Sequence, residues 1–162
     1  MRSRAATPND AEAIARIYNE GIEERIATFE TRPRRATVIQ DWFEDGHPVV
    51  VVEEDGMVIS FANASAYSAR ECYSGVAEFS VYTASEARGR GAGTLAMEAL
   101  ISAAEVAGLW KLVSRVFVEN EPSRELLLTL GFREVGVHEK HARLDGLWRD
   151  VVVVERLIPA NL

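Results

Sequence analysis

The chain has 162 residues, of which 48% are hydrophobic, and its 25 acidic and 18 basic side chains give a formal net charge of −7 at pH 7. This length predicts a single domain over residues 1–162 that can bury a core without disulfides. The acidic excess argues against a nucleic-acid partner, because phosphate binding needs a surplus of Lys and Arg.

The cysteine, histidine and apolar patterns exclude further classes. A single cysteine rules out an intramolecular disulfide framework, and we expect the 3 histidines to be dispersed, so no metal site is predicted. No run of about 18 apolar residues is present, and the N-terminal segment is charged rather than apolar. We therefore expect a cytoplasmic α/β protein without a membrane anchor or secretory signal.

The first half of the chain predicts a helix, a short second helix and three strands. Asn9 or Asp10 can cap the first helix, whose apolar face recurs at helical spacing in Ala13, Ile14, Ile17 and Tyr18. Asp55-Gly56 is a strong hairpin signal, since both positions tolerate positive φ. The expected ranges are loops at 27–35 and 68–75, a short helix at 37–43, and strands at 49–52, 58–66 and 76–83.

The second half predicts two helices and three strands. Gly108 and Gly131 are typical helix ends, because glycine readily adopts the left-handed conformation that closes a helix. The expected ranges are helices at 93–107 and 123–130 and strands at 112–118, 132–137 and 151–158. Strands and helices in this order predict an α/β fold with a mixed sheet covered by helices.

A glycine-rich turn separates the third strand from the next helix: Arg88-Gly89-Arg90-Gly91-Ala92-Gly93. Small residues there let a ligand approach the backbone, and the free N–H groups of the helix start favour an anion such as a pyrophosphate. The Gly-Lys-Ser/Thr ending of a Walker loop is absent, and the mid-chain position after a hairpin does not suit a dinucleotide fingerprint. The context fits the Arg/Gln-x-x-Gly-x-Gly/Ala motif that binds coenzyme A; the alternative is a turn with no ligand.

Neighbouring segments point the same way, and from Arg4 to Leu157 the chain resembles the Gcn5-related N-acetyltransferase (GNAT) superfamily. The superfamily signs are the glycine-rich turn after Val81-Tyr82-Thr83, then Asn120-Glu121-Pro122-Ser123 and Leu130-Gly131-Phe132. Within it, the chain is similar to the phosphinothricin and methionine sulfone/sulfoximine acetyltransferases. The branch markers are Ile17-Tyr18-Asn19, Thr28-Phe29-Glu30-Thr31-Arg32-Pro33, Ala69-Arg70, Tyr73, Glu78-Phe79-Ser80 and Gly146-Leu147-Trp148-Arg149-Asp150-Val151.

The resemblance implies a fold, a reaction and a cofactor site. The fold would be a mixed, splayed sheet flanked by helices in three layers (αβα), usually as a homodimer. The reaction would be acetyl-CoA-dependent acetylation of the α-amine of a small glutamate-like amino acid, such as phosphinothricin, methionine sulfoximine or sulfone, or an arsenical analogue such as arsinothricin, as a resistance function. The cofactor residues it implies are Val81, Tyr82, Thr83, Arg88, Gly89, Arg90, Gly91, Ala92, Gly93, Thr94, Asn120 and Ser123.

Glu78 is the candidate catalytic base. Acetyl transfer to an amine requires the neutral amine, and a free α-amino group is mostly protonated at pH 7. A carboxylate inside so apolar a strand is unusual, and burial there would raise its pKa towards the working range of a base. The family places its base at this point; the alternative is an edge-strand charge that faces solvent. A backbone N–H near Val81 would stabilise the oxyanion.

The resemblance also implies that Arg70, Tyr73 and Phe29 contact the substrate. A guanidinium can bind a carboxylate or phosphinate in bidentate fashion. The chain departs from the pattern at two positions: Leu127 replaces a Tyr or His that could protonate the leaving thiolate, and Gly75 replaces an aromatic residue of the branch.

Two other functions remain open from the sequence. The chain could acetylate another amine, such as a peptide N-terminus or a polyamine, which would not need Arg70. It could also be a non-catalytic acyl-CoA-binding sensor, which would not need Glu78.

Overall fold

A seven-stranded sheet in the order β1-β2-β3-β4-β5-β7-β6 forms the centre of the computed structural model, which describes residues 1–162. Every neighbouring pair is antiparallel except β4 and β5, which are parallel. The predicted mixed sheet is therefore confirmed. The strands are β1 (Arg2–Ala5), β2 (Val49–Glu54), β3 (Met57–Ala66), β4 (Val76–Thr83), β5 (Lys111–Phe117), β6 (Arg133–Leu144) and β7 (Leu147–Leu157).

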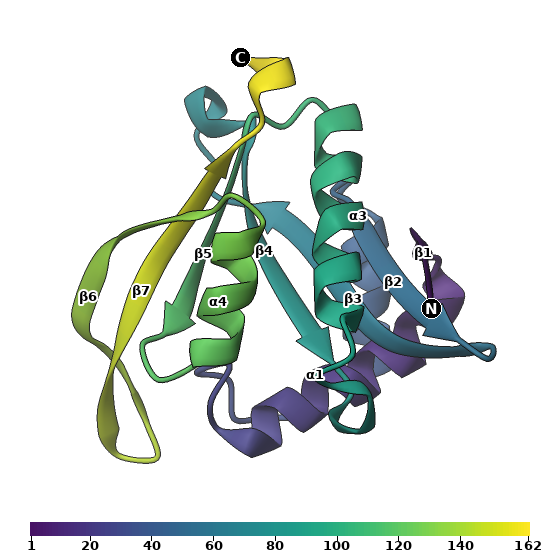
Figure 1. The fold of residues 1–162 in the computed structure, drawn as a ribbon, viewed down its shortest axis with the longest axis horizontal. Coiled ribbons are helices and arrows are strands. Elements are labelled where there is room, and N and C mark those ends of the chain that lie inside the picture. The colour runs from purple at the N-terminus through teal and green to yellow at the C-terminus, as the bar shows by residue number, and fades with distance from the viewer.

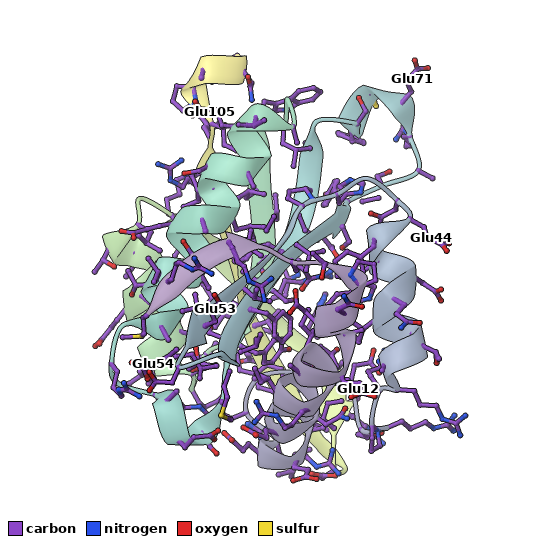
Figure 2. The ribbon with its side chains drawn as sticks, turned by 90° about the vertical axis from the view of Figure 1, so that its right-hand side faces the viewer. Glu12, Glu44, Glu53, Glu54, Glu71 and Glu105 are labelled. Atoms are coloured by element: carbon purple, nitrogen blue, oxygen red, sulfur yellow. The ribbon has the colours of Figure 1, made fainter.

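Helices cover both faces of the sheet, as the three-layer expectation requires. They are α1 (Ala11–Glu24), α2 (Ala36–Gln40), α3 (Ala92–Val106) and α4 (Glu121–Thr129). α3 and α4 lie in front of the sheet in Figure 1, and α1 lies behind it; Figure 2, turned by 90°, shows the sheet between them. β2 begins with an unbroken valine run, and Val49, Val50, Val51 and Val52 are all buried because both faces of this strand contact apolar layers.

Both hairpin turns use an Asp-Gly pair. Asp55 and Gly56, between β2 and β3, have φ values of 51° and 78°, which confirms the predicted turn. Asp145 and Gly146, with φ of 50° and 79°, join β6 to β7 in the same way. The last two strands, predicted at 132–137 and 151–158, are confirmed, but the predicted ranges were too short because both strands extend into one long hairpin. Its outer part is exposed and charged, so it lacks the apolar alternation that marks a strand.

β1 was also missed. It has only four residues, Arg2–Ala5, with a mixed polar pattern that no local rule assigns to a strand. It exists because it pairs with β2 over its whole length. Its stability comes from this long-range pairing rather than from its own propensity.

The sheet opens between β4 and β5. Only three residues of each strand are paired: Val76–Glu78 of β4 lie beside Lys111–Val113 of β5, and the strands then diverge. The second half of β4 therefore has β3 on one side and no strand on the other. Figure 1 shows the two strands separating, with α4 lying over the opening. This splay is the architecture that the resemblance implied.

Candidate active site

The exposed backbone of β4 faces this opening. In an antiparallel ladder, the N–H and C=O of every second residue point to the same neighbour. The Ala84 N–H donates to Ile59 O at 2.8 Å, which sets the phase of the β3–β4 ladder. The main-chain groups of Phe79, Val81 and Thr83 therefore point away from β3 and into the opening. The Ser114 hydroxyl of β5 donates to Phe79 O at 2.9 Å, which agrees with this phase.

Tyr82 differs from its two neighbours. Its carbonyl accepts from the Ser60 hydroxyl at 2.9 Å, so its main chain faces β3. Its ring packs beside Gly21 of α1, where a Cβ would come within 2.8 Å of it. Burial raises the pKa of the Tyr82 phenol, which keeps this side chain neutral in the pocket wall.

α4 supplies the other wall of the opening. Asn120 precedes this helix, and its Oδ1 accepts from the Ser123 N–H at 3.4 Å. Asn120, Ser123 and Leu127 line a narrow cavity together with Val81. The fold thus brings the predicted cofactor residues of β4 and α4 together. Leu127 is 1% exposed and provides no proton donor there.

The glycine-rich turn ends in an uncovered helix start. Gly91 has a φ of 89°, and a Cβ on it would meet nothing within 4 Å, so the turn requires its left-handed backbone rather than its small size alone. The first helical bond runs from the Leu95 N–H to Gly91 O. The N–H groups of Ala92, Gly93 and Thr94 thus have no partner within α3, and free donors of this kind at a helix start can bind an anion.

Both arginines of the turn are already paired. Arg88 Nη1 lies 2.6 Å from Glu24 Oε2, and this carboxylate raises the pKa of Arg88. Arg90 Nη2 lies 2.6 Å from Glu54 Oε2 at the end of β2. Figure 2 labels Glu54 among glutamates that are spread over the surface. Two of these acidic side chains, Glu24 and Glu54, are therefore the ion-pair partners of the cations in the turn.

A wider cavity of about 480 Å³ adjoins the opening. It lies between β4, β5, the loop after α1 and the β6–β7 hairpin. The predicted Phe29 lines it and packs against Phe117 with ring centroids 4.7 Å apart. Its acidic, basic and histidine lining residues are Glu30, Glu78, Arg115 and His141.

Glu78 lies in this cavity but is not buried. Its side chain is 37% exposed, and Oε1 accepts from Arg115 Nη2 at 2.7 Å. The expectation of a carboxylate enclosed by apolar groups is therefore wrong. Glu78 also differs from a free edge charge, because it faces a cavity and an arginine partner.

Arg115 and His141 were missed in the sequence. A charged residue inside the apolar strand at 112–118 was an available signal for Arg115, of the same kind as that for Glu78. His141 Nε2 lies 3.5 Å from Arg115 Nη1. Desolvation, His138 and Arg115 lower the pKa of His141. The expectation of dispersed histidines is wrong here, because the His138 and His141 rings lie 4.7 Å apart.

Arg70 and Tyr73 lie in the exposed loop between β3 and β4, outside the residues that line the cavity. The Arg70 guanidinium lies 5.7 Å from the Tyr73 ring centre. Beside them, Trp110 covers Gly75 so closely that a Cβ there would lie 1.8 Å from its ring. The aromatic side chain in this region is thus that of Trp110, just before β5, and position 75 provides none.

Metal-binding clusters and membrane-spanning helices are both absent. No group of three or more His, Cys, Asp or Glu side chains is placed to hold a metal ion. No helix has both the length and the apolar character needed to cross a membrane.

Known proteins match this chain over nearly its whole length. The model of the acetyltransferase (GNAT) family matches residues 14–132. A phosphinothricin N-acetyltransferase of Streptomyces coelicolor is 30% identical over 163 residues, covering 96% of this chain and 95% of the relative. An L-methionine sulfoximine/L-methionine sulfone acetyltransferase of Pseudomonas aeruginosa is 29% identical over 157 residues, covering 94% and 91%. The crystal structure of a phosphinothricin acetyltransferase from Sinorhizobium meliloti in complex with acetyl-CoA superposes with a TM-score of 0.90 at 28% identity, covering 97% of this chain and 88% of that one.

Proposed function

Since the chain belongs to the acetyltransferase (GNAT) family and is an acyltransferase enzyme, we propose that it transfers the acetyl group of acetyl-CoA to the α-amine of a small glutamate-like amino acid. Phosphinothricin, methionine sulfoximine or sulfone, and arsenical analogues such as arsinothricin are the candidate substrates, with resistance as the role. The names of the similar proteins, which act on phosphinothricin or on methionine sulfoximine and sulfone, support this choice.

The observation that carries the proposal is that the opening between β4 and β5 leads to the glycine-rich turn at the end of β4. The backbone of Val81 faces the opening, and Thr83, at the end of the same strand, lies beside the start of α3, because a Cβ on Gly93 would come within 3.3 Å of Thr83 Oγ1. This arrangement suits acetyl-CoA, since the strand can pair with an amide-bearing arm and the helix start can bind a pyrophosphate. Asn120 and Ser123 would contact the same arm, and Arg88 and Arg90 would exchange their carboxylate partners for phosphate.

Groups of this chain would then assist the acetyl transfer. Bound acetyl-CoA would supply a thioester; the transfer would form a nitrogen–carbon bond, break the carbon–sulfur bond and pass the second proton of the amine to the leaving sulfur through water. Glu78 accepts the proton of the substrate ammonium, directly or through water, so that the neutral amine can react. The Val81 N–H, which faces the opening, would donate to the carbonyl oxygen of the thioester. No side-chain acid is proposed, because Leu127 occupies the position where one would stand.

Arg70, Tyr73 and Phe29 are the proposed contacts to the remainder of the substrate. Phe29 already lines the cavity. Arg70 and Tyr73 lie just before β4 and would approach a bound ligand through movement of their exposed loop. We also expect a cytoplasmic location, where acetyl-CoA is available.

A homodimer is part of the proposal. The edge strand β6 and its partner β7 expose Val135, Val137, Leu147 and Trp148 by 45–64%. An unpaired strand edge with apolar side chains favours pairing with a second copy. Light scattering of the wild type and of Val137→Glu tests this; a wild-type monomer would contradict it.

A substrate panel tests the enzymatic proposal. Thiol release from acetyl-CoA is measured with phosphinothricin, methionine sulfoximine, L-glutamate, a peptide with N-terminal alanine and spermidine. We expect kcat/KM to be highest for a free glutamate-like amino acid. A higher value for the peptide or the polyamine would identify a different amine as substrate, and no thiol release with any amine would favour the sensor.

A further inference from the structure

We propose that Glu78 and Arg115 together recognise the ammonium and carboxylate of a free α-amino acid, with Arg115 binding the α-carboxylate. This inference rests on the proposed function and assigns a specificity role to a residue on β5. Arg70 is then left for the acidic group of the substrate side chain.

Glu78 and Arg115 meet where the sheet begins to open. Glu78 of β4 is opposite Val113 in the last paired position, and Arg115 lies two residues further along β5. Their side chains meet in the cavity with 2.7 Å between Oε1 and Nη2. In an α-amino acid, two carbon atoms separate the ammonium nitrogen from the carboxylate oxygens, so its opposite charges are also within hydrogen-bond distance of each other. The ion pair can thus match a zwitterion, because Glu78 can bind its ammonium and Arg115 can bind its carboxylate.

The charge balance of the cavity also favours Arg115. It is the only Arg or Lys among the lining residues, which also include the carboxylates of Glu30 and Glu78. A substrate carboxylate placed elsewhere in the cavity would meet acidic groups without a cation. Opposite charges in such a site favour binding, and like charges placed together disfavour it, so the substrate carboxylate should bind at Arg115 and away from the two glutamates.

Arg115 has donors to spare for a second anion. A guanidinium carries five N–H donors, and Glu78 accepts from one nitrogen of Arg115. The Arg115 side chain is 46% exposed and lines the cavity. The lowered pKa of His141 keeps that ring neutral near pH 7, so the positive charge that an anion meets at this point of the cavity belongs to Arg115. The guanidinium can therefore donate hydrogen bonds to a substrate carboxylate while it remains paired with Glu78.

The pairing has a consequence for the choice among amines. A peptide N-terminus carries an amide where a free amino acid carries its carboxylate, and a polyamine carries neither. Each would leave the Arg115 guanidinium without its second anion. The Glu78–Arg115 pair should thus favour free amino acids over both.

The test compares phosphinothricin with its decarboxylated analogue, (3-aminopropyl)methylphosphinate, which keeps the amine and the phosphinate. Arg115→Met should lower kcat/KM for phosphinothricin by about 100-fold and for the analogue by less than about 5-fold. Arg115→Lys should restore part of the preference, because it returns the charge without the planar fork. Arg133→Met removes an exposed arginine of β6 that pairs with Glu155, and it should leave both values unchanged.

The comparison separates Arg115 from other roles. Equal losses for the two substrates would mean that Arg115 only positions Glu78, and this would overturn the inference. Arg70→Ala should lower kcat/KM for both substrates alike, since both carry the phosphinate. If Arg70→Ala instead abolishes the preference for phosphinothricin, Arg70 reads the α-carboxylate and the assignment to Arg115 is wrong.

A binding measurement keeps the inference testable if the proposed function fails. Should the wild type acetylate no free amino acid, calorimetry of phosphinothricin with the CoA-loaded chain replaces the rates. Binding that Arg115→Met abolishes, with CoA affinity unchanged, would uphold the inference. Absence of binding by the wild type, or equal binding by both, would overturn it.

Discussion

At the scale of single residues, the chemistry depends on what surrounds Glu78. A carboxylate on an apolar strand would be a stronger base if it were enclosed, but Glu78 faces a polar cavity and the Arg115 guanidinium. A substrate ammonium must therefore enter this cavity to come within reach of the Glu78 carboxylate.

Glu78→Gln should lower kcat/KM at pH 7 by about 10²–10⁴-fold, the usual size of a general-base effect. The deficit should shrink as the pH rises, because the amine then loses its proton to solvent. Steady-state rates between pH 6 and 10 measure this. Glu105→Gln, an exposed glutamate at the end of α3 (Figure 2), serves as control. A Glu78→Gln enzyme with the wild-type rate at pH 7 would remove this residue from the mechanism.

At the scale of elements, α3 joins the core to the proposed cofactor site. Its buried residues include Ala96, Met97 and Leu100, which anchor the helix, while its first turn leaves N–H groups free. Gly93 packs tightly, since a Cβ would lie 3.1 Å from Leu126 and 3.3 Å from Thr83 Oγ1. The helix start is therefore held in place by packing before any ligand arrives.

Gly91→Glu should weaken CoA binding by at least about tenfold, because it places a carboxylate beside the N–H groups proposed for the phosphates. Gly108→Glu is a matched control at the other end of α3. Both glycines have positive φ, at 89° and 80°, and a Cβ at either position would meet no atom within 4 Å, so the two variants share the same backbone strain. Calorimetry should show a selective loss in Gly91→Glu; equal affinities in the two variants would contradict the site.

At the scale of the whole molecule, an ion-pair network joins the N-terminal strand to the sheet and to α1. The Asp10 carboxylate accepts from Arg4 Nη1 at 2.8 Å, from Arg4 Nη2 at 2.9 Å and from the Thr7 N–H at 2.8 Å. Arg4 also donates to Glu53 of β2 at 3.0 Å. Asp10 is only 8% exposed, so an unpaired group there would be costly. Short β1 is held by these contacts as well as by its ladder.

Asp10→Asn should lower the free energy of unfolding at pH 7 by about 1–3 kcal/mol. The Arg4 guanidinium lowers the pKa of Asp10 in the folded state, so its contribution is complete above the unfolded pKa of about 4 and is lost as the pH falls through the lower folded value. The difference between wild type and variant should therefore shrink below about pH 4. Urea unfolding at pH 7 and pH 3 measures it.

Glu12→Gln, an exposed acid in the first turn of α1, the helix that Asp10 precedes (Figure 2), is the control for Asp10→Asn and should change stability by no more than about 0.5 kcal/mol. An Asp10→Asn deficit that stays constant from pH 7 to pH 3 would show that the carboxylate charge is not its cause.

The sequence by itself determined the features that local pattern encodes. The Asp55-Gly56 turn, the valine run of β2 and the glycines at 89 and 91 follow from backbone preferences over a few residues, and they were predicted. The matched segments identified the family, and with it the splayed sheet and the placement of Val81 beside Asn120.

Only the tertiary structure decided what depends on residues far apart in the chain. β1 and the outer part of the β6–β7 hairpin lack an apolar pattern and become strands through pairing with a neighbour. Glu78 and Arg115 are 37 positions apart, and they meet because the crossover through α3 places β4 and β5 side by side. The carboxylate partners of Arg88 and Arg90 lie on α1 and β2, which are also distant from the turn in sequence. Such contacts are set by topology, which no local window of sequence contains, and they decide the charge balance of the site.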